Sequence, residues 1–203
     1  MPAPRHITAT KLLVVEGRDA EAFFNALLRH LGLAGVQVQS FGGKDELPGF
    51  LKALRTPPSF VEQVASLGLV RDAETDPAAA FQSVCSALRN AGLPAPQQPL
   101  MRTGERPQIS VFILPNATTT GKLETICLQA VASHPAMPCV EEYFRCVRRQ
   151  TGRLPADMVK AQVHAFLASC PKPDLLLGQA AHAGYLPWDS PAFDHIKGFL
   201  CQL

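Results

Sequence analysis

The chain has 203 residues, of which 47% are hydrophobic and 18% charged, which excludes a disordered chain and fits one α/β domain or one domain with an appendage. Its formal net charge of +2 is smaller than the basic excess usual in proteins that coat phosphates non-specifically. No apolar run approaches the roughly 20 residues of a membrane helix, and the N-terminus lacks the apolar stretch of a signal peptide. The six cysteines show no zinc spacing, which predicts reduced, structural thiols in a cytoplasmic protein that does not enter a membrane.

Apolar periodicity predicts alternating strands and helices along the first part of the chain. In chain order they are a strand at 11–15, a helix at 19–32, a strand at 36–41, a helix at 45–54, a strand at 64–70, a helix at 77–90 and a strand at 108–115. Strands that alternate with helices are typical of a parallel sheet with crossover helices. We therefore expect a Rossmann-like α/β domain over residues 1–130. Residues 131–203 are predicted to form a helical extension packed on the same domain. This extension could cap the sheet or form a homodimer interface.

Acidic residues follow two of these predicted strands. Glu16 ends the first, and Asp72, Glu74 and Asp76 follow the third at a spacing of two. Ligands of open parallel sheets bind beyond the carboxyl ends of the strands, and alternate residues of an extended chain point the same way. The carboxylates can therefore converge, and they would repel one another unless a cation lay between them. Mg²⁺ or Mn²⁺ suits such oxygen ligands.

Each of these features also has an ordinary structural explanation. A Glu-Gly pair after a strand is a turn signal. The segment "DAETDP" is a good helix N-terminus, with Thr75 or Asp76 as the cap before Pro77. The occurrence of both features at equivalent ends of two strands favours a site.

The order of the segments "VEGRDAEAFF", "SFGGKDEL", "GLVRDAETDP", "VFILP" and "GKLE" resembles the Toprim fold. That fold is shared by topoisomerases, bacterial primases, recombination mediators and the nuclease half of the overcoming-lysogenization-defect proteins. The layout is most similar to small stand-alone Toprim-like proteins, and the resemblance covers about residues 10–130. It implies a Toprim-like parallel sheet with a divalent metal site.

The resemblance also implies roles for individual acids. Glu16 would be a metal ligand or general acid/base, and Asp72 would be the first acid of the family's D-x-D pattern. Glu74 and Asp76 occupy the next two acidic positions, with the lengths of their side chains exchanged relative to the family. Glu124, in "GKLE", would be a further ligand for a second metal ion.

These observations predict a Mg²⁺- or Mn²⁺-dependent phosphodiesterase, a nuclease or nickase that acts on nucleic acid. A lysine would neutralise charge that develops at the phosphate, and Lys44 is the first candidate, ahead of Lys122 and Lys160. Two alternatives stay open: a phosphoryl-transfer enzyme for small phosphate esters, and a metal-binding module with a regulatory or binding role. The segment "NATTTGKLE" lacks two required positions of a P-loop, so an ATPase would be a separate partner chain.

Overall fold

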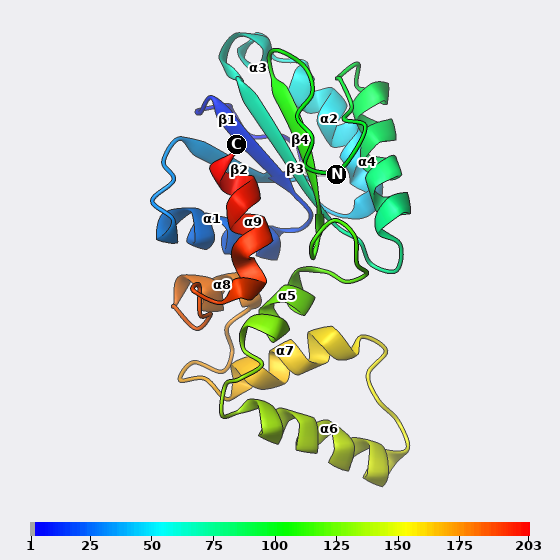
Figure 1. Cartoon of the computed structure of the whole chain (residues 1–203), viewed down its shortest axis with the longest axis vertical. Helices are drawn as coiled ribbons and strands as arrows, with labels where there is room; N and C mark the ends of the chain where they lie inside the picture. Colours follow the sequence, from blue (N-terminus) through cyan, green and yellow to red (C-terminus); the bar gives the residue numbers. More distant parts are fainter. Residues whose placement is uncertain (1–2) are drawn as a thin grey trace.

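A four-stranded parallel sheet with helices on both faces forms the centre of the computed structural model, which describes residues 3–203 (Figure 1). The strands are β1 (Lys11–Val15), β2 (Val36–Ser40), β3 (Ser66–Asp72) and β4 (Gln108–Leu114). They lie in the order β2-β1-β3-β4, and all three neighbouring pairs are parallel. The predicted α/β fold is confirmed. The strand order reverses between β1 and β3, which is where ligands bind in open sheets of this kind.

The helices form a layer on each face of the sheet, and α6 and α7 form a helical arm beyond it (Figure 1). Their bounds are α1 (Arg18–His30), the 3₁₀ turn η1 (Lys44–Glu46), α2 (Leu47–Arg55), α3 (Pro58–Gln63), α4 (Pro77–Asn90), α5 (Leu123–Ala130), α6 (Met137–Thr151), α7 (Met158–Ala168), α8 (Leu177–His182), the 3₁₀ turn η2 (Pro191–Phe193) and α9 (Asp194–Cys201). Helices α2 and α4 lie on one side of the sheet and α1, α8 and α9 on the other, whereas α6 and α7 extend beyond its lower end (Figure 1). Within residues 3–203, no helix is both long enough and apolar enough to cross a membrane.

The structure shifts several predicted boundaries by one or two residues and contains one helix that was not predicted. The third strand runs from Ser66 to Asp72 rather than over 64–70, because its last two residues still pair with the end of β4. The predicted helix at 45–54 begins as the 3₁₀ turn η1 and extends through α2 to Arg55. Helix α3 was not predicted, because a proline pair marks a helix end as readily as the first turn that Pro58 occupies here.

Alternate strand residues divide the interior into two cores, as the twofold side-chain period of a strand requires. Leu13 and Val15 belong to the core beneath α1 and the C-terminal helices. Leu12 and Val14 belong to the core beneath α2, α3 and α4. Because β1 is completely buried from Leu12 to Val15, its end is the first point at which a polar side chain can leave the interior.

Two glycines allow the C-terminal helices to lie close to the rest of the domain. A Cβ atom at Gly178, in α8, would lie 2.5 Å from both the carbonyl oxygen of Asp19 and the Cβ of Ala22. A Cβ at Gly68, in β3, would lie 2.8 Å from a methyl group of the buried Leu203. The segment 177–203 is therefore packed directly on α1 and on the sheet.

Candidate metal-binding site

Three loops at the carboxyl end of the sheet bring predicted site residues together. Val15 lies opposite Val70 in the β1–β3 register, so Glu16 is level with the last residues of β3. Asp72 ends β3, and Glu124 lies in the first turn of α5, after β4. Glu16, Asp72 and Glu124 therefore follow adjacent strands at the point where the strand order reverses, and this group is here called the acidic edge.

Hydrogen bonds tie the loop after β3 to the loop before α5. The N–H groups of Glu74 and Gly121 each donate to the other's carbonyl oxygen at 2.9 Å. The N–H of Leu123 donates to Oδ1 of Asp72 at 3.0 Å. Glu74 has a φ of 53°, a left-handed conformation that costs about 1 kcal/mol or more for a residue other than glycine. The paired loops hold Glu74 in this conformation beside the half-buried Asp72.

Asp72 is the most strongly perturbed acid of this edge. Burial is the main cause, and together with the neighbouring charges of Glu16, Glu124 and Glu74 it raises the pKa of Asp72 to about 7, against the lowering effect of the hydrogen bond from Leu123. The same side chain would titrate near pH 4 in water. Near neutral pH its ionised form is therefore unfavourable in the protein alone, and a bound cation would stabilise it.

Glu16 lies next to a cation that the sequence analysis missed. Burial raises the pKa of Glu16, while Arg71 lowers it and Lys44 lowers it less. Nε of Arg71 lies 3.8 Å from Oε2 of Glu16, and the Arg71 guanidinium also donates to Oγ of Ser83 at 2.7 Å. The available signal was the arginine directly before Asp72 in "VRD", at the same strand end as the acids.

The other predicted site residues, Asp76, Lys44 and Lys160, lie at the starts of three helices. Asp76 is the N-cap of α4, and its Oδ1 accepts the N–H of Ala79 at 2.9 Å, so its carboxylate serves the helix start. Lys44 lies in η1, near enough to Glu16 to affect its pKa. Lys160 is exposed in the first turn of α7.

Lys122 is the lysine that lies among the acids. Its Nζ forms an ion pair with Asp157, the N-cap of α7. Although burial lowers it, the pKa of Lys122 is raised by this pair and by the nearby Glu74 and Glu124. The pair also lowers the pKa of Asp157. Lys122 therefore joins the acidic edge to the helical arm.

The two roles of Asp157 can be separated by substitution. Asp157→Asn keeps an effective N-cap and removes the ion pair, so we expect the free energy of unfolding to fall by less than about 1 kcal/mol. Asp157→Ala removes both interactions and should cost about 1–2 kcal/mol. Urea denaturation measures the free energy of unfolding of both variants. If both lose the same amount relative to the wild type, the N-cap contributes nothing to stability.

The donor chemistry of this edge fits a hard divalent cation. Glu16, Asp72 and Glu124 supply carboxylate oxygens only, and the charges of Glu16 and Glu124 raise the pKa of Asp72. Within residues 3–203, no three Asp, Glu, His or Cys side chains are grouped closely enough to hold a metal ion as they stand. A change of side-chain rotamer at a glutamate is therefore needed to bring three ligands together.

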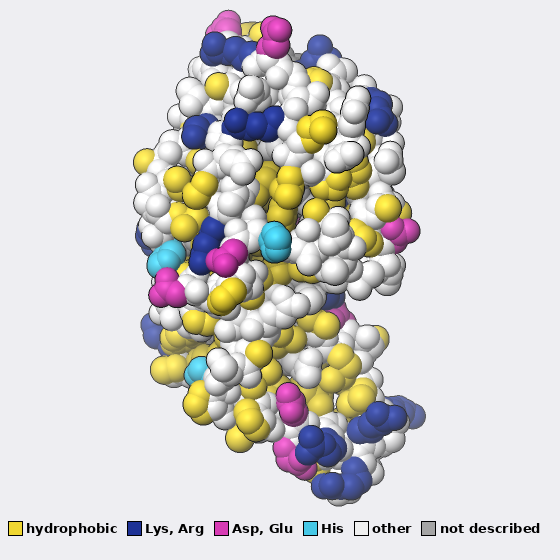
Figure 2. All heavy atoms as spheres, in the orientation of Figure 1, with side chains coloured by type: hydrophobic (Ala, Val, Ile, Leu, Met, Phe, Trp, Pro, Cys, Tyr) yellow, Lys and Arg dark blue, Asp and Glu magenta, His cyan; other side chains and the backbone are white. Residues whose placement is uncertain are grey.

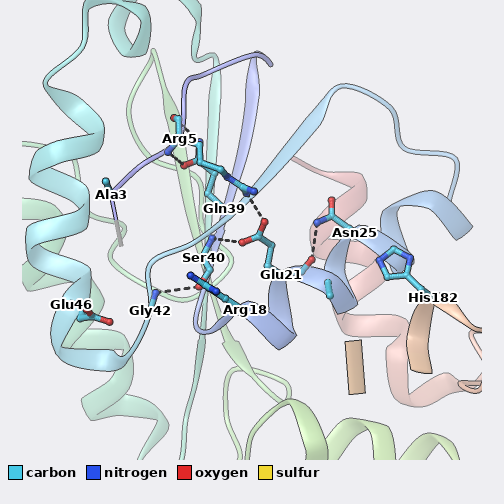
Figure 3. Close-up of a pocket in the computed structure, with 11 residues that line it drawn as sticks. Ala3, Arg5, Arg18, Glu21, Asn25, Gln39, Ser40, Gly42, Glu46 and His182 are labelled. Carbon is cyan, nitrogen blue, oxygen red and sulfur yellow. Dashed lines mark hydrogen bonds and ion pairs between the residues drawn. The ribbon is translucent and has the colours of Figure 1, made fainter. Parts of the chain in front are cut away.

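A polar cavity of about 960 Å³ lies beside this edge, at the carboxyl end of β2 (Figure 3). Arg5 pairs with Glu21 in its wall, and Oε2 of Glu21 accepts the N–H of Ser40 at 3.1 Å. Arg18 also lines the cavity, and among the described residues its guanidinium has no ion pair. The N–H of Gly17 donates to the carbonyl of Gly42 at 3.0 Å and so joins the cavity wall to the loop that carries Glu16.

The structure is that of an α/β protein with a parallel sheet and a group of carboxylates at the point where the strand order reverses. The chain belongs to the family described as "Protein of unknown function (DUF3226)", whose model matches residues 10–203. The chain is similar to the solved structure of the C-terminal region of the Xanthomonas campestris pv. campestris OLD protein phased with iodine. That similarity has 16% sequence identity and a TM-score of 0.45, and it covers 96% of this chain and 97% of that chain. No curated protein matches the chain.

Proposed function

We propose that the protein is a Mg²⁺- or Mn²⁺-dependent phosphodiesterase that cleaves or nicks nucleic acid. The observation that carries this proposal is the half-buried Asp72, whose pKa is raised and which is surrounded by the charges of Glu16, Glu124 and Glu74 where the strand order reverses. Burying an acid beside other acids is costly unless a cation compensates for it. The motif resemblance to Toprim proteins supports phosphodiester chemistry, because the same positions carry metal-binding acids in that family.

Each residue of the edge has a proposed role. Asp72, Glu16 and Glu124 would hold the divalent cation, with Glu74 close enough to join them. The cation, when bound, supplies positive charge to a phosphate and acidifies a water molecule. In the alternative role of general base, Glu16 would accept a proton instead of binding the cation, with its carboxylate held by the ion pair with Arg71.

Cationic side chains around the edge would bind the substrate's phosphates. Lys122 is held by Asp157 beside the acids and can offset charge at the scissile phosphate, with Lys44 on the other side near Glu16. The cavity lined by Arg18 has room for an adjoining nucleotide. The site thus pairs a carboxylate centre with flanking cations.

A second candidate function is a metal-binding module without turnover. Two observations favour it: the described carboxylates are not pre-arranged as three ligands, and Asp76 is committed to the cap of α4. Such a module would bind Mn²⁺, and the bound ion would raise its free energy of unfolding, but it would not cleave phosphodiesters.

Supercoiled plasmid incubated with Mn²⁺ or Mg²⁺ tests the nuclease proposal. We expect nicked or linear product from the wild type, at least a hundredfold less from Asp72→Ala and from Asp72→Asn, and none with EDTA. The matched control is Asp189→Ala, which removes an exposed acid of the C-terminal segment and should retain full activity. Cleavage that survives both Asp72 variants would refute the proposed site. Binding of Mn²⁺ without cleavage would establish the module, and hydrolysis of nucleoside phosphates alone would point to a small-ester enzyme.

A further inference from the structure

The helical arm is formed by α6, α7 and the loop between them, and the end of α6 with the start of this loop carries the largest local excess of positive charge in the chain. Residues 145–153 contain four of the 19 Lys and Arg residues and none of the 17 Asp and Glu residues. The four are Arg145, Arg148, Arg149 and Arg153, here called the arginine end of the arm. Since the net charge of the chain is only +2, the remainder of the chain is net negative. The local charge of this segment, +4, therefore exceeds the net charge of the whole chain.

The arginine end is available to a partner. All four arginines are exposed, and Figure 2 shows a group of Lys or Arg side chains at the tip of the arm. Arg145 pairs with Glu142, whereas no ion pair of Arg148, Arg149 or Arg153 is found within residues 3–203. The left-handed Gly152 ends α6 and turns the chain, so that Arg153 follows directly on the last helical turn. Three guanidinium groups thus have no ion-pair partner in the part of the chain that the structure describes.

The arm packs on the domain and contacts the acidic edge. Val140 and Phe144 of α6 and Val163 and Phe166 of α7 are buried in the same core as α1 and the C-terminal helices. Asp157 begins α7 and pairs with Lys122 of the edge. Asp157 is the fourth residue after Arg153, so the chain between them spans at most about 14 Å. A short segment of chain therefore joins the arginine end of the arm to the residue that pairs with Lys122.

We propose that the arginine end of the arm binds the sugar-phosphate backbone of a nucleic acid whose scissile bond lies at the acidic edge, an inference that rests on the proposed function. Guanidinium groups match phosphate oxygens in geometry and keep their charge at any physiological pH. A net charge of only +2 for the whole chain gives little general attraction to DNA, so a concentrated patch must supply the contacts. The patch fixes the direction in which the strand leaves the edge.

Fluorescence anisotropy with a labelled 30-base-pair duplex in EDTA tests the arm without cleavage. The variant is Arg148→Gln/Arg149→Gln/Arg153→Gln, and the control is Arg29→Gln/Lys52→Gln/Arg89→Gln, which removes the same charge from exposed positions on α1, α2 and α4. We expect the arm variant to raise Kd at least tenfold, and to reduce the slope of log Kd against log salt by about 2–3, since each phosphate contact contributes about 0.9. The control should change Kd less than twofold.

Further outcomes separate this inference from the proposed function. If the two triple variants lose duplex affinity equally, or if neither loses any, the role of the arm is refuted, even if the protein nicks the plasmid. Arm-dependent duplex binding by Asp72→Ala supports the surface even if no nicking is found. Binding of the wild type to vesicles with 30% phosphatidylserine, combined with unchanged duplex affinity of the arm variant, would assign the patch to a membrane surface and refute the proposal. Restored affinity in the corresponding triple lysine variant would confirm that charge is what the partner recognises.

Discussion

Asp72→Asn is expected to stabilise the metal-free protein at pH 8 by about 2–4 kcal/mol in the free energy of unfolding. The pKa of this carboxyl is about 7 in the folded protein against 3.8 for the unperturbed group. The folded state therefore holds the proton more tightly than the unfolded state does. The stability from this group is fully present below about pH 4 and is lost as the pH rises through 7. Asparagine is neutral at both ends of that range and can still accept the N–H of Leu123.

Urea denaturation in EDTA at pH 5 and pH 8 measures this effect. The wild type should lose stability between the two values, with Glu16 contributing in the same direction because its pKa is also raised. The variant should lose much less. Addition of Mn²⁺ at pH 8 should stabilise the wild type and not the variant. A variant that is less stable than the wild type at pH 8 would show that Asp72 is not under electrostatic strain.

Gly178→Ala should lower the free energy of unfolding by about 3 kcal/mol, near the upper end of overpacking effects. The new methyl group would lie 2.5 Å from the Asp19 carbonyl oxygen and from the Cβ of Ala22. Both atoms belong to α1, which is fixed by the core and cannot move aside as a flexible side chain could. The substitution would also disturb the hydrogen bond from the N–H of Gly178 to Oδ1 of Asp19, at 2.7 Å. We expect α8 to separate from α1.

Gly198→Ala is the matched control, because Gly198 lies in the neighbouring helix α9 and a Cβ there would meet nothing within 4 Å. It should raise the free energy of unfolding by up to about 1 kcal/mol, the difference in helix propensity. Thermal denaturation should place the two variants on opposite sides of the wild type, about 6–12 °C below it for Gly178→Ala. Equal midpoints would mean that α8 and α1 do not pack as closely as described.

The sheet was predictable because its signals are local. Each strand is a short apolar or alternating run, and the alternation of strands with helices implies parallel pairing whatever the loops contain. The position of Glu16 and Asp72 at one edge follows from the same pattern. Helix α3 lacked such a signal, since a six-residue helix between prolines has too few turns to show a period.

Contacts between distant parts of the chain explain what the sequence could not predict about the site. Lys122 and Asp157 are 35 residues apart, and nothing in their spacing indicates that they meet. The left-handed conformation of Glu74 was equally hidden, because glycine or asparagine is the usual marker of such a position. Asp76 had a clear signal with two meanings, since an aspartate after a strand and before a helix suits both an N-cap and a metal ligand. Spacing alone did not distinguish the two roles.

The strand order also determines when the acidic edge can exist during folding. Strands β1 and β3 are neighbours in the sheet, yet α1, β2, α2 and α3 lie between them in the chain. Parallel neighbours cannot form from a local hairpin, and such non-local pairing is a slow step. A nascent chain that has emerged as far as α3 contains Glu16 without the strand that carries Asp72. The mutual repulsion of the carboxylates therefore arises only once β3 joins β1, so divalent cations should act on the late stage of folding and leave the early pairing of β1 with β2 unaffected.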